Sequence, residues 1–263
     1  MPRTKSEKAL SNRRIVITRP HEQNAELGAL LSKHGASVLE MPLIEIDYAE
    51  NEDVAKEIFD CVCEYDWLVF TSANGVRGFF RQFFARFRDM RSLGPCRIAC
   101  VGPATARAVE ELHLEVDCVP EEHTGAALAE KIVSEHGVEN LKICVITGNQ
   151  NSTALAETLE KARGIVDVFP VYETGENDVS EHPSLADFRK NGADAIVFAS
   201  GSAVKSFVSQ AALLKLEKDA VQPRVVAIGA PTASALKAAG IPVSAIAEKA
   251  SAPGILDAVL GIF

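Results

Sequence analysis

The chain has 263 residues, of which 47% are hydrophobic and 24% charged, and its formal net charge at pH 7 is −9. This composition is typical of a globular protein, and the length allows two domains of ordinary size. The negative charge argues against nucleic-acid binding, which needs clustered lysine and arginine, and no apolar run approaches the roughly 20 residues that span a bilayer. Residues 1–14 are polar and basic, so we expect a disordered tail there rather than a secretory signal, with an organellar leader as the alternative.

Short apolar runs alternate with helical stretches along the whole chain. In the first half we expect strands at residues 14–18, 37–41, 67–72, 97–102 and 115–120. In the second half we expect them at residues 142–147, 165–169, 195–200, 225–229 and 243–246. The runs are unbroken rather than alternating, as in strands that are covered on both faces. The pattern therefore predicts an α/β fold with parallel, doubly wound sheets.

Helices are expected between these strands, for example at residues 23–34, ended by Gly35, and 232–239, ended by Gly240. A third helix is indicated by apolar residues at spacings of three and one, which fall on one helix face. They are Val76, Phe79, Phe80, Phe83, Phe84 and Phe87. We expect this face to lie in a core and the intervening arginines to face solvent.

The chain repeats itself at an offset of about 128 residues. The matching segments are 66–72 (DWLVFTS) with 194–200 (DAIVFAS), 101–106 (VGPATA) with 228–233 (IGAPTA), 16–18 (VIT) with 145–147 (VIT), and 41–43 (MPL) with 169–171 (FPV). Anchors that hold one register over the whole chain predict two domains of like architecture. A ligand site between two such domains is the natural consequence.

An extended segment follows the second strand of each repeat, at residues 42–46 and 170–174. If the domains are in tandem, the boundary falls near Gly137 and both segments are internal edges. If both segments are crossings, the chain leaves one domain near Pro42 and returns near Pro170. The spacing of the residues does not choose between these arrangements.

Five turns between a strand and the next helix are rich in small and hydroxyl residues. They lie at residues 71–75, 102–105, 147–149, 199–202 and 229–232. Such turns form the carboxyl edge of a parallel sheet, where open α/β folds bind ligands, and their N–H and hydroxyl groups suit an anion. The same residue types cap helices without any further function. Their duplication at equivalent positions favours an anion-binding cleft.

Familiar catalytic motifs are absent from the sequence, which has no Gly-rich dinucleotide fingerprint, Walker loop or Gly-x-Ser-x-Gly elbow. The six cysteines form no Cys-x-x-Cys pair, and we expect them to be small buried residues rather than metal or redox centres. Any reaction then depends on positioning and hydrogen bonds. Tyr172, on the second extended segment, is a candidate proton donor, with packing as the alternative.

Together, in order and spacing, these motifs resemble the uroporphyrinogen-III synthase family. The likeness covers nearly the whole chain after residue 13. The matching residues are Val16-Ile17-Thr18-Arg19-Pro20, Phe70-Thr71-Ser72 with Val76, Val101-Gly102 with Thr105-Ala106, Pro170-Val171-Tyr172, Ile228-Gly229 with Pro231-Thr232-Ala233, and Ala247-Glu248.

The resemblance implies two α/β domains joined by a two-stranded β-ladder, residues 1–43 with 173–263 forming the first and 44–172 the second. It implies closure of hydroxymethylbilane to uroporphyrinogen III, in tetrapyrrole biosynthesis, with inversion of ring D and loss of water through a spiro intermediate. No cofactor or metal is implied. We expect a cytoplasmic monomer that contacts hydroxymethylbilane synthase only transiently and binds neither nucleic acid nor membrane.

Under this resemblance Tyr172 matches the family's crossing tyrosine, and we expect it to donate a proton to the leaving hydroxyl. A phenol suits the role because its ordinary pKa of about 10 keeps it protonated at neutral pH. Thr105 and Thr232 match the family's cleft threonines and are expected to bind substrate. The other expected binding residues are Arg19, Ser72, Ala73, Asn74, Thr147, Gly148, Ser200, Gly201 and Ser202.

Two other classes of protein share parts of this pattern. A two-lobed protein that binds a small anion without catalysis would have a similar architecture, although secreted versions carry a signal peptide. A nucleotide-binding regulator would carry a Gly-rich phosphate fingerprint after a strand, and the sequence has none.

Overall fold

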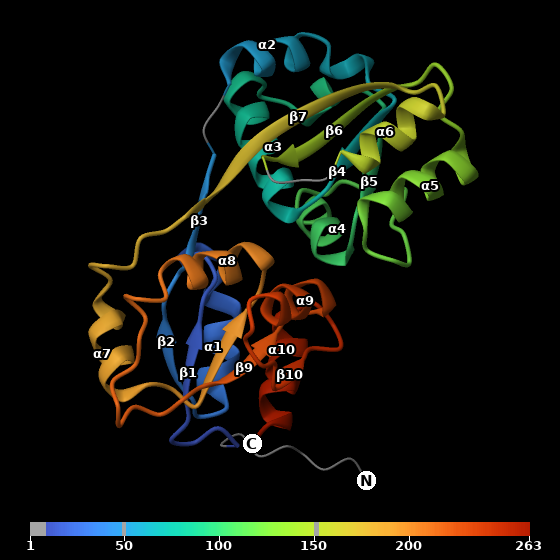
Figure 1. Ribbon diagram of the computed structural model, residues 1–263. Coiled ribbons are helices and arrows are strands. Elements are labelled where there is room, and N and C mark those ends of the chain that lie inside the picture. The colour runs from blue at the N-terminus through green and yellow to red at the C-terminus, as the bar shows by residue number, and fades with distance from the viewer. Residues whose placement is uncertain (1–8, 49–50, 150–152) are drawn as a thin grey trace. The chain divides into compact units, whose positions relative to one another are not determined.

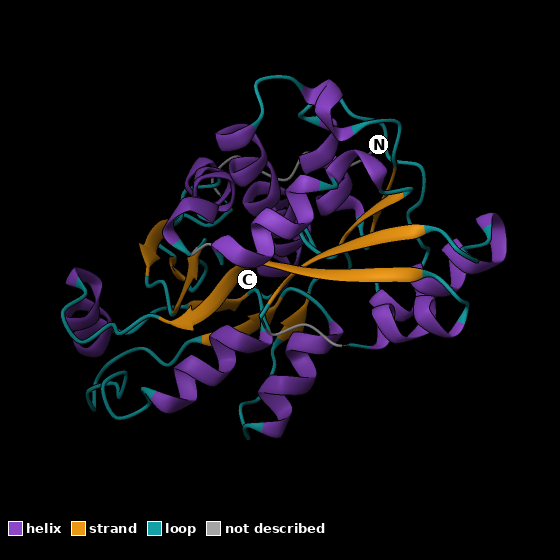
Figure 2. Cartoon of the chain, turned by 90° about the horizontal axis from the view of Figure 1, so that it is seen from above, coloured by secondary structure: helices purple, strands orange, loops and turns teal. Residues whose placement is uncertain are grey.

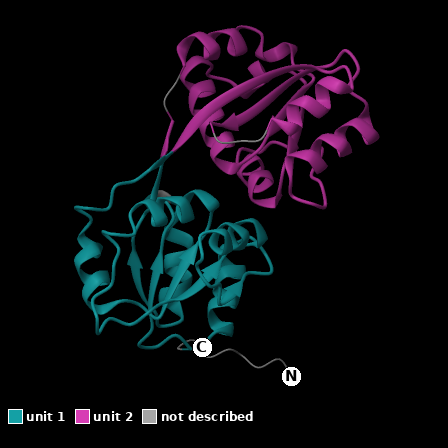
Figure 3. Ribbon diagram, in the orientation of Figure 1, with its two compact units in different colours: residues 1–45, 175–263 teal, residues 46–174 magenta. Residues whose placement is uncertain are grey.

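The computed structural model describes residues 9–48, 51–149 and 153–263. It divides into two compact units (Figure 3): unit 1 is Met1–Glu45 with Gly175–Phe263, and unit 2 is Ile46–Thr174. The chain therefore enters unit 2 after Glu45 and returns to unit 1 at Gly175. The boundaries expected from the sequence fall two residues before each of these positions.

Unit 1 is built on a parallel sheet with the strand order β10-β9-β8-β1-β2 (Figure 1). Helices α1 and α10 pack together, as do α8 and α9. The elements of this unit are β1 (Arg14–Ile17), η1 (His21–Gln23), α1 (Ala25–Lys33), β2 (Ser37–Glu40), α7 (Pro183–Asn191), β8 (Ala195–Phe198), α8 (Gly201–Ser209), β9 (Arg224–Ala227), α9 (Ala230–Ala238), β10 (Ala245–Ile246) and α10 (Ala252–Gly261).

Unit 2 has the strand order β3-β7-β6-β4-β5, in which β7, β6, β4 and β5 run parallel. Helices α3 and α4 pack together, and α5 packs on α6. Two of its strands cross the boundary, since β3 begins and β7 ends in unit 1. Its elements are β3 (Ile44–Asp47), α2 (Glu52–Asp60), η2 (Val62–Glu64), β4 (Trp67–Phe70), α3 (Ala73–Arg86), η3 (Met90–Leu93), β5 (Arg97–Cys100), α4 (Pro103–Glu110), α5 (Gly125–His136), β6 (Lys142–Gly148), α6 (Ala154–Lys161) and β7 (Ile165–Glu176).

Each sheet has a hydrophobic core on both faces. Along β4, Leu68 and Phe70 join one buried cluster, whereas Trp67 and Val69 join another. Successive strand residues point to opposite faces, so an unbroken apolar run is what a doubly covered strand requires. Figure 2 shows the strands flanked by helices. The prediction of an α/β fold with doubly wound parallel sheets is confirmed.

The aspartates that begin the matched segments 66–72 and 194–200 make the same contacts in both units. Asp66 Oδ2 accepts a hydrogen bond from Lys142 N at 2.8 Å, and Asp194 Oδ2 accepts one from Arg14 N at 2.8 Å. The backbone N–H of each aspartate donates to the carbonyl of the same partner, at 2.9 and 2.8 Å respectively. The aspartate thereby ties β4 to β6 in unit 2 and β8 to β1 in unit 1, which gives the repeat a structural cause.

The prediction of a strand at residues 115–120 is wrong. Only an isolated bridge joins Ala99 to Cys118 there. Asp117 Oδ2 accepts a hydrogen bond from Ile98 N at 2.8 Å. In a continuous strand, this N–H of β5 would instead donate to a backbone carbonyl of the neighbouring strand. The sheet edge ends at this carboxylate.

Three smaller expectations also need correction. Leu10 lies in the stretch expected to be a tail, yet it is fully buried and its N–H donates to His34 O at 2.9 Å; residues 1–8 lie outside the described part of the chain. Phe84, at the margin of the α3 apolar face, is 48% exposed. Cys63, in η2, is exposed, and Cys61 and Cys96 are half-buried, so only three of the six cysteines are buried. The apolar pattern of the sequence does not determine the burial of individual residues at the border of a buried segment.

Gly78 allows α3 to lie directly against β7. A Cβ at this position would lie 2.8 Å from both Cγ2 and the carbonyl oxygen of Val171. We expect Gly78→Ala to lower the free energy of unfolding by about 2 kcal/mol through overpacking, as measured by urea denaturation. Gly28→Ala is the matched control on α1: its Cβ would meet only Ile17 Cδ1 at 4.0 Å, so up to about 1 kcal/mol of stabilisation is expected. Equal effects of the two substitutions would contradict the close packing of α3.

Candidate active site

Tyr172 and Ser72 meet at the carboxyl edge of the unit 2 sheet. Ser72 follows β4, Tyr172 lies in β7, and their hydroxyl oxygens are 3.0 Å apart. Ser72 is also the N-cap of α3, because its Oγ accepts a hydrogen bond from Gly75 N at 3.0 Å. A hydroxyl donates once and accepts twice, so Ser72 can donate to Tyr172 while it caps the helix. The phenol proton is then available for another acceptor.

Gly148 forms the floor beneath the Tyr172 ring. The pairing of β6 with β7 shifts register between Thr147 and Gly148, which sets Gly148 opposite Tyr172. A Cβ on Gly148 would lie 2.4 Å from Tyr172 Cζ, far inside contact distance. Asn149 N donates to Tyr172 O at 3.2 Å and fixes the backbone beside the ring. Tyr172 is only 9% exposed, so most of its surface is in contact with the protein.

The other unit 2 residues expected from the sequence lie in neighbouring turns. Thr147 is buried, and its Oγ1 lies 3.4 Å from that of Thr71. Ala73 and Asn74 form the half-buried first turn of α3, where Asn74 Oδ1 accepts from the Arg77 guanidinium at 3.3 Å. Thr105, in the first turn of α4, is only 5% exposed. Ser72, Gly148 and Tyr172 are therefore brought into direct contact, whereas Thr105 lies on another strand's turn.

Unit 1 repeats this plan at its own carboxyl edge. Ser200 follows β8 and caps α8, its Oγ accepting from Ala203 N at 3.1 Å, and Gly201 and Ser202 form the first turn of that helix. Thr232, at the position in α9 that Thr105 has in α4, is 4% exposed. Arg19 follows β1 and donates to Gln23 Oε1 at 3.2 Å. Unit 1 has no counterpart of the Tyr172 contact among the residues that the structure describes.

Two contributors were missed by sequence reasoning. The ring centroid of Tyr48, just after β3, lies 6.5 Å from that of Tyr172, and the Arg81 guanidinium lies 5.9 Å from the Tyr48 centroid. The available signal was the alternation along the first extended segment, which continues to Tyr48. The two tyrosines come together because β3 and β7 are adjacent strands of one sheet.

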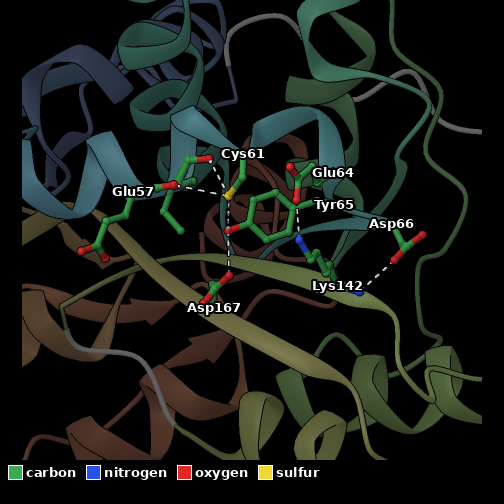
Figure 4. A network of polar contacts seen from close by, with 8 residues as sticks. Glu57, Cys61, Glu64, Tyr65, Asp66, Lys142 and Asp167 are labelled. Carbon is green, nitrogen blue, oxygen red and sulfur yellow. Dashed lines mark hydrogen bonds and ion pairs between the residues drawn. The ribbon is translucent and has the colours of Figure 1, made fainter.

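A second polar network lies at the opposite, amino-terminal edge of the same sheet (Figure 4). Tyr65 donates to Asp167 Oδ2 at 2.8 Å, and Lys142 pairs with Glu64. Burial, with Cys144 and Asp167 nearby, raises the pKa of Tyr65 above the ordinary tyrosine value. Tyr65 thus links the residues that precede β4 to β7. It also provides a control for Tyr172.

The cysteines and acidic residues do not assemble into a reactive cluster in the part of the chain that the structure describes. Burial raises the pKa of Cys96 to about 11 and that of Cys100 to about 12, so both thiols stay protonated at neutral pH. No group of three or more His, Cys, Asp or Glu side chains suited to a metal ion occurs among the described residues. Within the same residues, no helix has both the length and the apolar character needed to cross a membrane.

The two capping serines allow a paired test. Ser72→Ala and Ser200→Ala each remove one helix cap, so we expect each to lower the free energy of unfolding by about 1 kcal/mol. Ser72→Ala also removes the partner of the Tyr172 hydroxyl, so it alone should change the Tyr172 environment. Urea denaturation and the NMR resonance of Tyr172 measure the two effects. A Tyr172 resonance that responds equally to both substitutions would contradict the contact.

The fold and this site define a doubly wound α/β protein of two units, with hydroxyl-bearing turns at the carboxyl edge of each sheet. Residues 25–257 match the family model described as uroporphyrinogen-III synthase HemD. The chain belongs to this uroporphyrinogen-III synthase family.

Individual relatives agree with the family model. A putative uroporphyrinogen-III synthase of Methanothermobacter thermautotrophicus is 30% identical over 234 residues, which cover 86% of this chain and 90% of the relative. The porphyrin biosynthesis protein HemD of Ruminiclostridium josui is 29% identical over 97% of this chain, which spans 49% of that longer relative.

Solved structures share the fold. Uroporphyrinogen-III synthetase from Helicobacter pylori superposes with a TM-score of 0.65 at 20% identity, covering 95% of this chain and 100% of that one. A mutant uroporphyrinogen III synthase from Thermus thermophilus gives a TM-score of 0.62 at 18% identity, covering 95% and 98%.

Proposed function

We propose that this protein is an enzyme that closes hydroxymethylbilane to uroporphyrinogen III, inverting ring D and releasing water. Family membership gives the reaction class, and the contact of Tyr172 with Ser72 above Gly148 is the observation that carries the chemistry. A protein that only binds a small anion would have no need of a phenol held in this way.

In the proposed reaction, Tyr172 donates its proton to the hydroxyl of the substrate's hydroxymethyl group. The carbon–oxygen bond breaks, and water leaves with both electrons of that bond. The carbon left behind is attacked by the substituted carbon of the terminal pyrrole, which gives a spiro centre. The older bond from that centre to its bridging carbon then breaks, and the bridging carbon bonds to the unsubstituted α-carbon of the same ring, whose hydrogen leaves as the proton that returns to the phenolate. Ser72, donating to the phenol oxygen, stabilises the phenolate until it regains a proton.

The acetate and propionate groups of the substrate need hydrogen-bond donors rather than a cluster of lysines. We propose that the strand-end turns supply them, with Thr105 and Thr147 in unit 2 and Arg19, Ser200 and Thr232 in unit 1, whereas the single O–H of Ser72 is used on Tyr172. Hydrogen bonds to a charged group contribute about 1.5–3 kcal/mol each, so a few suffice to orient the bilane. The net charge of −9 is then compatible with an anionic substrate, because hydrogen-bond donors close to the carboxylates determine binding.

We propose a cytoplasmic location, a monomeric state and only transient contact with the enzyme that supplies hydroxymethylbilane. The free thiols at Cys61, Cys63 and Cys96, which are exposed or half-buried, support a reducing compartment. Size-exclusion chromatography with light scattering tests the monomer.

To test the activity, the full chain is incubated with hydroxymethylbilane in large molar excess over the protein. The product is then oxidised, and the porphyrin isomers are separated. Type III porphyrin in large excess over protein is the expected result. Type I alone, the product of unassisted closure, would refute the proposal. Retention of one substrate per chain without turnover would indicate a binding protein instead.

A further inference from the structure

We propose that Tyr48 is a positioning residue for Tyr172, held in turn by Arg81. The inference rests on the proposed function, since it concerns the residue that donates the proton. It adds a residue to which neither the family resemblance nor the sequence motifs assign a role.

Two groups of unit 2 lie close to the Tyr172 ring. On one side lies the bare Cα of Gly148, as its missing Cβ would lie 2.4 Å from Cζ. The ring of Tyr48 is also close, with centroids 6.5 Å apart and ring planes tilted by 57°. This spacing falls within the roughly 4.5–7 Å range in which aromatic pairs attract. The Tyr172 hydroxyl, at the far end of the ring, reaches Ser72 at 3.0 Å.

Helix α3 holds this arrangement at two points. Its N-cap, Ser72, contacts the Tyr172 hydroxyl, and Arg81, in a later turn, lies with its guanidinium 5.9 Å from the Tyr48 ring centroid. A cation over an aromatic face is attracted by the ring quadrupole. The helix itself is fixed against β7 through Gly78 and Val171. One rigid element therefore sets both the direction of the phenol and the ring beside it.

The physical role of Tyr48 is to limit tilting of the Tyr172 ring. Gly148 presents only backbone to the Tyr172 ring, and the neighbouring Tyr48 ring adds a side-chain contact. Proton transfer requires the donor oxygen within hydrogen-bond reach of the leaving group, and small misplacements reduce the rate strongly. Loss of the Tyr48 ring should therefore lower kcat more than it raises KM.

The chain has only three tyrosines, Tyr48, Tyr65 and Tyr172, which makes the test direct. The full chain labelled with 3-fluorotyrosine gives one ¹⁹F environment per tyrosine, each assigned from its Tyr→Phe variant. We expect Tyr48→Leu to move the Tyr172 resonance, to leave that of Tyr65 in place, and to lower kcat on the order of tenfold with little change in KM. Tyr48→Phe, which keeps the ring, should resemble the wild type in both measurements.

An unmoved Tyr172 resonance in Tyr48→Leu would overturn the proposal. A loss of turnover as large in Tyr48→Phe as in Tyr48→Leu would also overturn it, because the Tyr48 hydroxyl would then be the active group. Arg81→Met is the second variant in case Tyr48→Leu does not fold, with a smaller shift of the same Tyr172 resonance expected and no shift contradicting the role. The NMR result stands without activity, so failure of the wild type to form type III porphyrin would refute the proposed function alone.

Discussion

Tyr172→Phe should lower turnover of hydroxymethylbilane by about a hundredfold or more, since general acid catalysis typically contributes about 10²–10⁴ in rate. The substitution removes the phenol oxygen and keeps the ring that rests on Gly148 and faces Tyr48. Among the described residues the phenol oxygen is hydrogen-bonded to Ser72 alone, so the free energy of unfolding should change by about 1 kcal/mol or less. Steady-state kinetics and urea denaturation measure the two quantities.

Tyr65→Phe is the matched control for this substitution. Tyr65 loses its hydrogen bond to Asp167 and the weaker one that it accepts from Cys61 Sγ at 3.8 Å, both at the amino-terminal edge of the sheet. We expect a similar change in stability and unchanged turnover. Wild-type turnover in Tyr172→Phe would remove the phenol from the mechanism, and an equal loss in both variants would show a general effect of tyrosine removal.

Gly148→Ala should reduce turnover nearly as much as Tyr172→Phe. The added Cβ would lie 2.4 Å from Tyr172 Cζ and 2.6 Å from Cε2, so the ring must leave its position. A donor displaced by about an ångström loses on the order of a hundredfold in rate. Gly148 has no unusual φ, so the cause is the contact and not backbone strain.

The double variant distinguishes this cause from a separate defect. If Gly148→Ala acts by displacing Tyr172, combining it with Tyr172→Phe should cost little more than either substitution alone. Costs that multiply would mean that Gly148 affects turnover by another route. Gly28→Ala, which lies in the other unit and outside the candidate site residues, should leave turnover unchanged.

The sheets and their order along the chain were accessible to sequence reasoning because buried parallel strands leave a local record. The runs that became β4 and β8 are apolar on both faces, and Asp66 and Asp194 recur because each ties a strand start to its neighbour. Helix α3 was likewise visible from its phenylalanine spacing. These signals arise from residues adjacent in sequence.

Edges of the sheets were less accessible. The expected strand at residues 115–120 failed because the carboxylate of Asp117 competes for the Ile98 N–H, a contact that apolar patterning does not register. The segment 170–174 proved continuous with the strand before it, as part of the long β7. At such positions one side chain can decide whether a ladder continues.

The site could be predicted in kind but not in arrangement. Tyr172, Ser72 and Gly148 were named from the sequence as separate residues, yet their contact depends on the register shift between Thr147 and Gly148. Tyr48 approaches Tyr172 only through the pairing of two strands distant in sequence. Long-range register is set by packing, which no local motif encodes.

The most direct measurement is the ratio of type III to type I porphyrin formed by wild type, Tyr172→Phe and Tyr65→Phe in one assay. We predict type III from the wild type and from Tyr65→Phe, and mainly type I from Tyr172→Phe, because unassisted closure then overtakes the slowed reaction. Only type I from the wild type, or the same ratio and rate from all three chains, would contradict the assignment of ring closure to Tyr172 in β7.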